Sequence, residues 1–291
     1  MTIIPENLII HSPDKKLIKK MKDFVLDEEV LFECESDFHS ISVVDTKIGR
    51  FLKYNDTYQA GFIKTKEYKG NLPYINYFLI PYLINDNVKN ILFIGLGSGF
   101  IIKQYEKLFK NLKKIDIIDI EENIPIIAQR YFDFNFSNIS NFYLQDALIF
   151  LKNTKIKYDL IVVDVAGDEG IDERFCDKEY LKLIKKRLTK NGIFVSNMPS
   201  SRDIFHKNNQ FALNLIKDYK ENFKNVLIFN GETSNEIFYK TFFDLDEIVL
   251  DVTNLIMISA DIDLKISEKN ITEIVKLKID INKYLKDLVN N

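Results

Sequence analysis

The chain has 291 residues, 46% of them hydrophobic, so it is long enough to bury one large core together with a smaller appended unit. Forty basic and forty-three acidic residues leave a net charge of −3, which favours neither nucleic acid nor an anionic membrane as a partner. Two cysteines and the absence of a membrane-spanning apolar run predict a cytoplasmic protein without a disulfide framework. His11, His39 and His206 lack ligand-like spacing, so we expect no metal site.

The N-terminal part reads as antiparallel β-structure. Hydrophobic and polar residues alternate around Ile41 and Val43, and residues 47–50 are suited to a hairpin turn. We therefore predict a small β-strand domain over residues 1–70. The aromatic residues that follow Gly70 predict a packed helix leading into the first core strand.

Helix and strand patterns then alternate over residues 71–291, which is typical of an open, mostly parallel α/β sheet. The expected strands are 90–94, 115–120, 142–144, 158–163, 192–196, 226–229 and 254–259. The expected helices are 100–109, 125–132 with Asn123 as its cap, 148–151, 179–188 and 209–223, with a Lys-rich helical stretch over 271–285. The aromatic residues between 238 and 243 are interpreted as packing a strand pair.

The most informative motif is a hydrophobic strand that ends in three alternate glycines, Gly95, Gly97 and Gly99. Glycines let the backbone turn sharply at a strand end and approach a ligand closely. Asp119 ends the next hydrophobic run, where a carboxylate can bind both ribose hydroxyls. A dinucleotide fingerprint would need glycine where Phe100 stands, so a mononucleoside ligand is favoured.

Asp146 and Ala147 follow the third strand of the sheet. There a carboxylate can accept the amino group of adenine while a neighbouring backbone N–H meets a ring nitrogen. A bland alternative is that Asp146 only caps the helix that begins at Ala147, although capping and binding can coexist.

These motifs together resemble the spermidine synthase family of aminopropyltransferases. The resemblance rests on 94–99 (Ile-Gly-Leu-Gly-Ser-Gly), 119–122 (Asp-Ile-Glu-Glu), 146–147 (Asp-Ala) and 158–164 (Tyr-Asp-Leu-Ile-Val-Val-Asp), in this order, and on a strand that ends in Gln59. It covers roughly residues 30 to 240 and implies a Rossmann-like, seven-stranded methyltransferase fold behind an N-terminal β domain. A homodimer in the cytoplasm is the assembly that the family implies.

The resemblance also implies roles for individual residues. Decarboxylated S-adenosylmethionine, or S-adenosylmethionine itself, would be the co-substrate, and Asp164 would be the catalytic carboxylate. The residues implied in binding the co-substrate are Gly95, Gly97, Ser98, Gly99, Asp119, Ile120, Asp146 and Ala147, and those implied in binding the amine substrate are Gln59, Tyr74 and Asp168. Alternatively, Asp164 is a strand-end aspartate that holds loop N–H groups.

The chain departs from the family pattern around the amine. Ser98 stands where the family usually has an aspartate, and Ile75 and Asn76 replace a polar residue and a glutamate. The segment 165–169 lacks the family's second aspartate in register, the family glutamine near the β unit falls at His39, and the late substrate tyrosine falls near Glu232. Acidic residues between 168 and 173 still suit a cationic substrate, or they only keep a loop in water.

Three hypotheses follow. The first is a transferase that moves an aminopropyl group to a small amine or polyamine. The second is a small-molecule methyltransferase, since Ser98 removes a charge that would repel the carboxylate of S-adenosylmethionine. The third is a non-catalytic nucleoside-binding homologue, because the amine anchors are changed.

Overall fold

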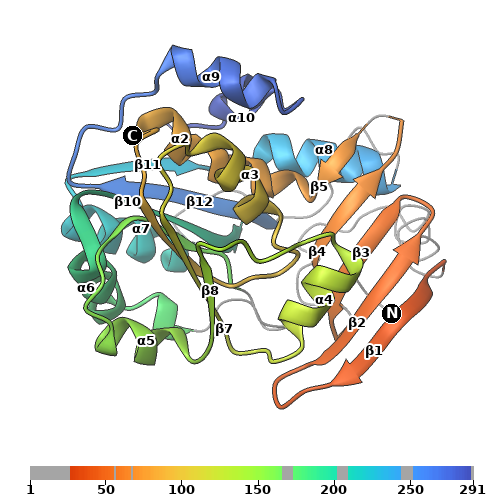
Figure 1. The fold of residues 1–291 in the computed structure, drawn as a ribbon. Coiled ribbons are helices and arrows are strands. Elements are labelled where there is room, and N and C mark those ends of the chain that lie inside the picture. Colours follow the sequence, from red (N-terminus) through yellow and green to blue (C-terminus); the bar gives the residue numbers. More distant parts are fainter. Residues whose placement is uncertain are drawn as a thin grey trace.

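The computed structural model of the protein describes residues 27–55, 57–66, 68–165, 173–201, 209–243 and 252–289. This part of the chain forms a small β-sheet beside a larger α/β sheet (Figure 1). None of the helices in these ranges combines the length and hydrophobicity needed to cross a bilayer.

The N-terminal sheet has five antiparallel strands in chain order, which confirms the predicted β unit. Its strands are β1 (Glu29–Glu35), β2 (Ser40–Thr46), β3 (Gly49–Tyr54), β4 (Thr57–Lys64) and β5 (Lys69–Asn71). The predicted hairpin turn is confirmed, since Thr46 pairs with Gly49 across it. Gln59 lies on β4 where the register with β3 shifts by one residue, as at a β-bulge. The division into domains at residue 70 stays a prediction.

The larger sheet has seven strands in the order β11-β12-β10-β9-β6-β7-β8. They are β6 (Asn90–Ile94), β7 (Lys114–Asp119), β8 (Ser140–Leu144), β9 (Tyr158–Val163), β10 (Leu188–Ser201), β11 (Asn225–Phe229) and β12 (Val252–Ala260). The five strands from β10 to β8 are parallel, and β12 runs antiparallel between β10 and β11. The predicted Rossmann-like α/β architecture is therefore confirmed.

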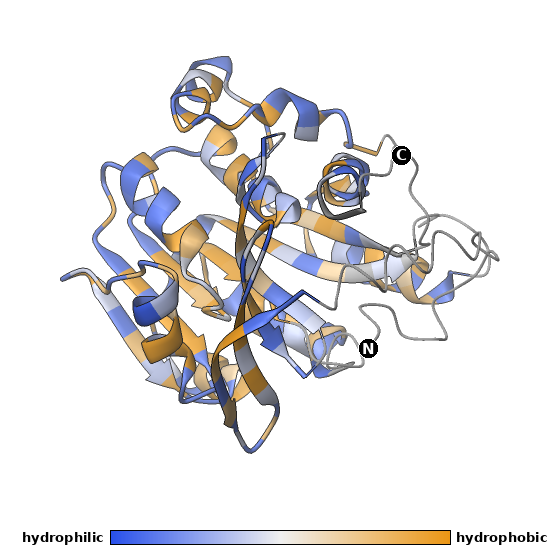
Figure 2. Cartoon of the chain, turned by 90° about the vertical axis from the view of Figure 1, so that its right-hand side faces the viewer, coloured by the Kyte–Doolittle hydropathy of each residue, from blue (hydrophilic) through white to orange (hydrophobic). Residues whose placement is uncertain are grey.

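Helices cover both faces of this sheet. They are η2 (Pro73–Leu79), α2 (Ile80–Ile84), α3 (Phe100–Leu108), α4 (Ile124–Tyr131), α5 (Ala147–Asn153), η3 (Glu173–Phe175), α6 (Lys178–Arg187), α7 (Gln210–Asn222), α8 (Glu232–Phe243), α9 (Glu268–Val275) and α10 (Ile281–Leu285). Successive residues of β6 serve opposite faces: Ile91 and Phe93 belong to the core beneath η2, α2 and α3, whereas Leu92 packs with α5, α6 and α7. Hydrophobic residues are accordingly concentrated along the strands (Figure 2).

Three local predictions are wrong. Residues 238–243 belong to α8 and not to a strand pair; this helix begins where Asp287, from beyond α10, accepts the Thr233 N–H at 2.6 Å, a tertiary contact that local patterning does not reveal. Asn123 precedes α4, but its side chain makes no capping hydrogen bond. Strand β10 continues to Ser201, well past the expected end at 196.

The segment from α10 onward fastens η2 and the edge strand β11. Asp287 accepts hydrogen bonds from the Tyr77 hydroxyl and from the backbone and hydroxyl of Thr233. Val289 donates its N–H to the Ile228 carbonyl at 2.8 Å, next to the bridge between Phe229 and Leu288. One carboxylate thus connects the helix that carries Tyr74 with α8.

We expect Asp287→Ala to lower the free energy of unfolding by about 2–3 kcal/mol, because it leaves several donors without their acceptor. Asp263→Ala is the matched control: the side chain of Asp263 is 69% exposed and pairs with exposed Lys265, so its loss should cost about 0.5 kcal/mol or less. Urea unfolding of both variants measures the difference. Equal effects would contradict the fastening role.

Candidate functional site

The predicted site residues follow four neighbouring parallel strands at one edge of the sheet. In the order β9, β6, β7, β8, the strand ends lead to Asp164, the glycine loop 95–99, Asp119 and Asp146. At about 4.8 Å between strands, the backbone from Asp164 to Asp146 spans about 14 Å. The chain passes from β6 to β7 on one side and returns to β9 on the other, so a topological switch point lies between the glycine loop and Asp164. Ligands of α/β sheets bind in the crevice at such points.

The glycine loop lies directly against the end of β9. Gly95 has φ +96°, and a Cβ at this position would lie 2.4 Å from the carbonyl oxygen of Asp164. A Cβ placed on Gly97 would have room, since it would lie 3.6 Å from the Cβ of Ala60 in β4, an ordinary van der Waals contact. The loop is therefore closed on the Asp164 side and covered by the N-terminal sheet, and Ser98 within it is buried.

Asp119 is held by two backbone donors. Its Oδ2 accepts the Leu96 N–H at 2.9 Å and its Oδ1 accepts the Glu121 N–H at 3.0 Å. Burial raises the pKa of Asp119, and these backbone hydrogen bonds partly offset that rise. The carboxylate is thus joined to the glycine loop and fixed in direction.

Asp146 has two partners. Its Oδ1 caps α5 by accepting the Ile149 N–H at 3.0 Å, so the capping alternative describes a real contact. Its Oδ2 lies 3.0 Å from Nη1 of Arg174 in η3. An ion pair this exposed contributes little stability, and carboxylate oxygens can accept further hydrogen bonds. Ala147, the other residue predicted here, is buried at the start of α5.

Three large hydrophobic side chains are exposed near Asp119 and Asp146. They are Ile120 (40% exposed), Leu144 (54%) and Ile149 (49%). The Gln145 N–H donates to the Asp119 carbonyl at 3.0 Å, so the ends of β7 and β8 lie side by side. Exposed apolar side chains beside the carboxylates of Asp119 and Asp146 are suited to contact the faces of a planar base. Only Ile120 was anticipated from the sequence.

Asp164 lies between two neutral donors. The Tyr74 hydroxyl of η2 donates to Oδ2 and the Asn197 amide of β10 donates to Oδ1, each at 3.1 Å. Burial raises the pKa of Asp164 to about 6, although both hydrogen bonds act to lower it. Oδ1 of Asn197 has no hydrogen-bond partner among the described residues and is buried. The place of Asn197 directly after the expected strand 192–196 suggested from the sequence that it borders the pocket, and the structure adds its contact with Asp164.

The structure therefore brings together Asp164, Tyr74, the glycine loop and Asp119, with Asp146 at the far end of the row. Gln59 lies on β4 directly before Ala60, the neighbour of Gly97, so it is near the loop. Asp168 lies outside the described residues. No group of three His, Cys, Asp or Glu side chains within the described ranges is placed to hold a metal ion.

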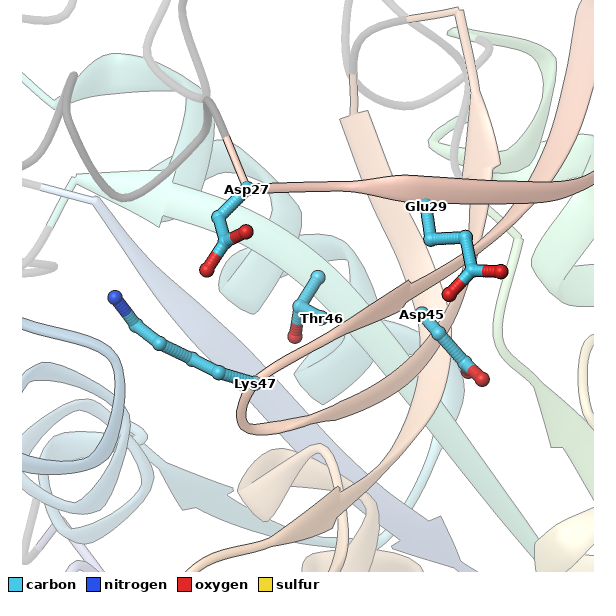
Figure 3. Close-up of a pocket in the computed structure, with 5 residues that line it drawn as sticks. All are labelled: Asp27, Glu29, Asp45, Thr46 and Lys47. Atoms are coloured by element: carbon cyan, nitrogen blue, oxygen red, sulfur yellow. The ribbon is translucent and has the colours of Figure 1, made fainter.

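A separate cavity of about 270 Å³ lies at the other end of the N-terminal sheet. Figure 3 shows the residues that line it: Asp27, Glu29, Asp45, Thr46 and Lys47. It is at the Thr46 end of β2, whereas the Ser40 end of that strand faces the carboxyl end of β7. A seven-residue strand, about 20 Å long, separates the two. This cavity is not part of the row of aspartates.

Comparison with known proteins agrees with this geometry. The model of the spermine/spermidine synthase domain matches residues 78–230, more than half of the chain. The chain belongs to the spermine/spermidine synthase family. It is 28% identical to a polyamine aminopropyltransferase of Alkaliphilus metalliredigens over 179 residues, and 29% identical to one of Clostridium botulinum over 181 residues. Each match covers 60% of this chain and 61% of the relative's length.

The fold agrees as well. The spermidine synthase from Thermotoga maritima superposes with a TM-score of 0.66 at 14% identity, covering 90% of this chain and 84% of that one. The two proteins thus share an N-terminal β-sheet beside a seven-stranded α/β sheet, as the sequence predicted.

Two residues at which the sequence departs from the expected family pattern, Asn76 and His39, have well-defined partners in the structure. Asn76, at the family's glutamate position, is buried and donates its amide to Tyr284 at 2.7 Å and to Tyr68 at 3.3 Å. The Asn76 amide is therefore engaged by Tyr284 of α10 and by Tyr68, which lies between β4 and β5. His39, at the family's glutamine position, contacts Glu121 at 2.5 Å.

Gly95→Ala should lower the free energy of unfolding by about 2–4 kcal/mol, because the added methyl group overlaps the Asp164 carbonyl at a left-handed backbone position. Gly97→Ala, also left-handed but with open space, should cost only about 1 kcal/mol. Denaturant unfolding of the pair isolates the contact. Similar losses of unfolding free energy in the two variants would contradict the close approach of Gly95 to the Asp164 carbonyl.

Asp164→Asn should make the protein more stable above pH 6 than the wild type. The folded pKa of about 6 exceeds the unfolded value, so the neutral form is favoured by folding, and that contribution is lost as pH rises through about 6. The gain should grow from nothing near pH 4 to about 2 kcal/mol at pH 8. Thermal unfolding across this range checks it, and a gain that is the same at every pH would contradict a buried, titrating Asp164.

Proposed function

We propose that this chain binds a sulfonium nucleoside, decarboxylated S-adenosylmethionine or S-adenosylmethionine, and transfers an aminopropyl or similar alkyl group to a small amine or polyamine. The observation that carries the proposal is Asp164, a buried carboxylate with a pKa of about 6 between Tyr74 and Asn197 at the switch point of the sheet. Membership of the spermine/spermidine synthase family supports the same reaction.

Asp164 is suited to the proton transfer that this reaction needs. The lone pair of the amine forms a C–N bond, the C–S bond breaks, and its electron pair neutralises the sulfonium as a thioether. The alkylated nitrogen then carries a proton that must leave. Asp164 accepts this proton and orients the N–H groups, while Tyr74 and Asn197 hold the carboxylate in place. A thioether leaving group needs no acid.

The other end of the row suits the nucleoside. Asp119, with both oxygens oriented by backbone N–H groups, would accept the ribose hydroxyls, and Asp146 would accept the adenine amino group. Ile120, Leu144 and Ile149 would contact the faces of the base. The glycine loop between Asp119 and Asp164 would lie along the arm that carries the transferred group, and the whole ligand would extend over the spacing of about 14 Å from Asp146 to Asp164.

Ser98 favours a second candidate. A buried hydroxyl in the loop neither attracts an ammonium nor repels a carboxylate, so the methionine arm of S-adenosylmethionine is compatible with this position. Methyl transfer to a small molecule is therefore the alternative, and the relative affinity for the two nucleosides distinguishes it. A homodimer is the assembly that we propose, on the family resemblance alone.

Incubating the purified chain with decarboxylated S-adenosylmethionine and a panel of mono-, di- and triamines tests the proposal. We expect methylthioadenosine together with an alkylated amine. Asp164→Asn should lower the rate about 10²–10⁴-fold with little change in nucleoside affinity, because it removes the proton acceptor and keeps the shape.

Asp159→Asn is the matched control, since Asp159 lies at the opposite end of β9, where it accepts hydrogen bonds from the Lys89 and Asn90 N–H groups and the Thr189 hydroxyl. Its rate should equal that of the wild type. Failure to form methylthioadenosine with any amine of the panel would refute aminopropyl transfer. Formation of S-adenosylhomocysteine from S-adenosylmethionine, with no product from the decarboxylated nucleoside, would establish the methyltransferase alternative instead.

A further inference from the structure

Glu121 connects the end of β7 to the turn between β1 and β2. Its side chain is almost completely buried, with 1% of the residue exposed. Oε1 accepts the Ser36 hydroxyl at 3.1 Å and lies 2.5 Å from Nδ1 of His39. Because a carboxylate only accepts hydrogen bonds, the His39 ring nitrogen is the donor in this contact.

The turn is shaped to receive this carboxylate. Ser36 Oγ accepts the N–H groups of Phe38 at 3.1 Å and His39 at 2.9 Å, and its hydroxyl proton has two acceptors at 3.1 Å, the His39 carbonyl and Oε1 of Glu121. The His39 ring stacks on Tyr54 of β3, with centroids 4.5 Å apart and planes 13° from parallel. Contacts that do not involve Glu121 therefore hold both of its partners, Ser36 and His39, in place.

Glu121 is also one of the two groups that orient Asp119. Its backbone N–H donates to Asp119 Oδ1, while the Leu96 N–H of the glycine loop donates to Oδ2. Only Ile120 separates the two acidic residues, and it is the exposed member of the three. The contacts of the Glu121 side chain thus help to set the direction of its backbone N–H. That N–H in turn sets the orientation of the Asp119 carboxylate.

Stability alone is a poor explanation for this arrangement. Oε2 of Glu121 is buried and has no hydrogen-bond partner among the described residues. A buried carboxylate that is only half satisfied costs desolvation free energy that its contacts repay incompletely. Such costs are typical of groups that are retained for function.

We propose that Glu121 is a positioning residue, which fastens the N-terminal sheet to the end of β7 and thereby sets the Asp119 carboxylate for a ribose diol. The inference rests on the proposed function for the identity of that ligand. The N-terminal sheet is then part of the nucleoside site through two contacts, Ala60 on the glycine loop and the turn 36–39 on Glu121.

The first test needs no ligand. In Glu121→Ala, amide hydrogen exchange at residues 96 and 121 should become about tenfold faster, because the backbone that orients Asp119 loses its anchor. Exchange at 115–118, inside β7, should not change. Unaltered protection at residues 96 and 121 would overturn the inference.

Asp116→Asn is the control on the same strand. Asp116 is fully buried, accepts hydrogen bonds from Tyr158 and Asn141 and pairs with Lys114, whereas Asp119 accepts from Leu96 and Glu121. The control substitution should lower the unfolding midpoint without accelerating exchange at residues 96 and 121. The comparison separates the positioning of Asp119 from a general loss of stability.

The second test measures the dissociation constant of methylthioadenosine by calorimetry. Glu121→Ala should weaken binding about five- to tenfold, the equivalent of one misplaced hydrogen bond, and Asp116→Asn should leave it unchanged. Equal weakening in both variants would overturn the inference. If the wild-type protein binds no methylthioadenosine, the proposed function fails, and the inference is decided by the exchange experiment.

Discussion

The close approach of the glycine loop to the end of β9 is the constraint on which the site depends. A hydrogen at Gly95 is all that fits beside the carbonyl oxygen of Asp164. Because the loop is tight there, the next residue can donate its N–H to Asp119 on the far side, and one short segment touches both carboxylate-bearing strand ends. The parallel sheet brings the strands together, but the loop sets the spacing between the carboxylates of Asp164 and Asp119.

The antiparallel N-terminal sheet and the larger α/β sheet meet at the glycine loop and at Glu121. The larger sheet supplies the aspartates, and the smaller one covers the loop through Ala60 and holds Glu121 through Ser36 and His39. Burial raises the pKa of Tyr54, and the nearby charges of Asp119 and Glu121 raise it further, so these groups lie within electrostatic reach of one another. Removing water from this junction strengthens each of these interactions.

Much of the fold was predictable because its signals are local. Hydrophobic runs marked the strands of the large sheet, and the spacing from Gly95 to Asp119 marked two neighbouring strand ends. The signals that failed depend on distant partners. The aromatic residues of α8 suit a strand as well as a helix, and the helix is selected by Asp287 at its first turn. Asn76 looked like a vacated amine anchor, but its partner Tyr284 is 208 residues away. Neither Asn197 beside Asp164 nor Arg174 beside Asp146 has a periodic pattern to reveal it.

The bond between Tyr77 and Asp287 joins residues 210 positions apart. The helix that presents Tyr74 to Asp164 therefore acquires its outer support only after residue 287 has been synthesised. Such non-local contacts form late in folding, since the entropy of closing the intervening loop must be overcome first. During translation the nascent sheet can assemble while Tyr74 is still unsupported, so the geometry around Asp164 is completed after the sheet has formed.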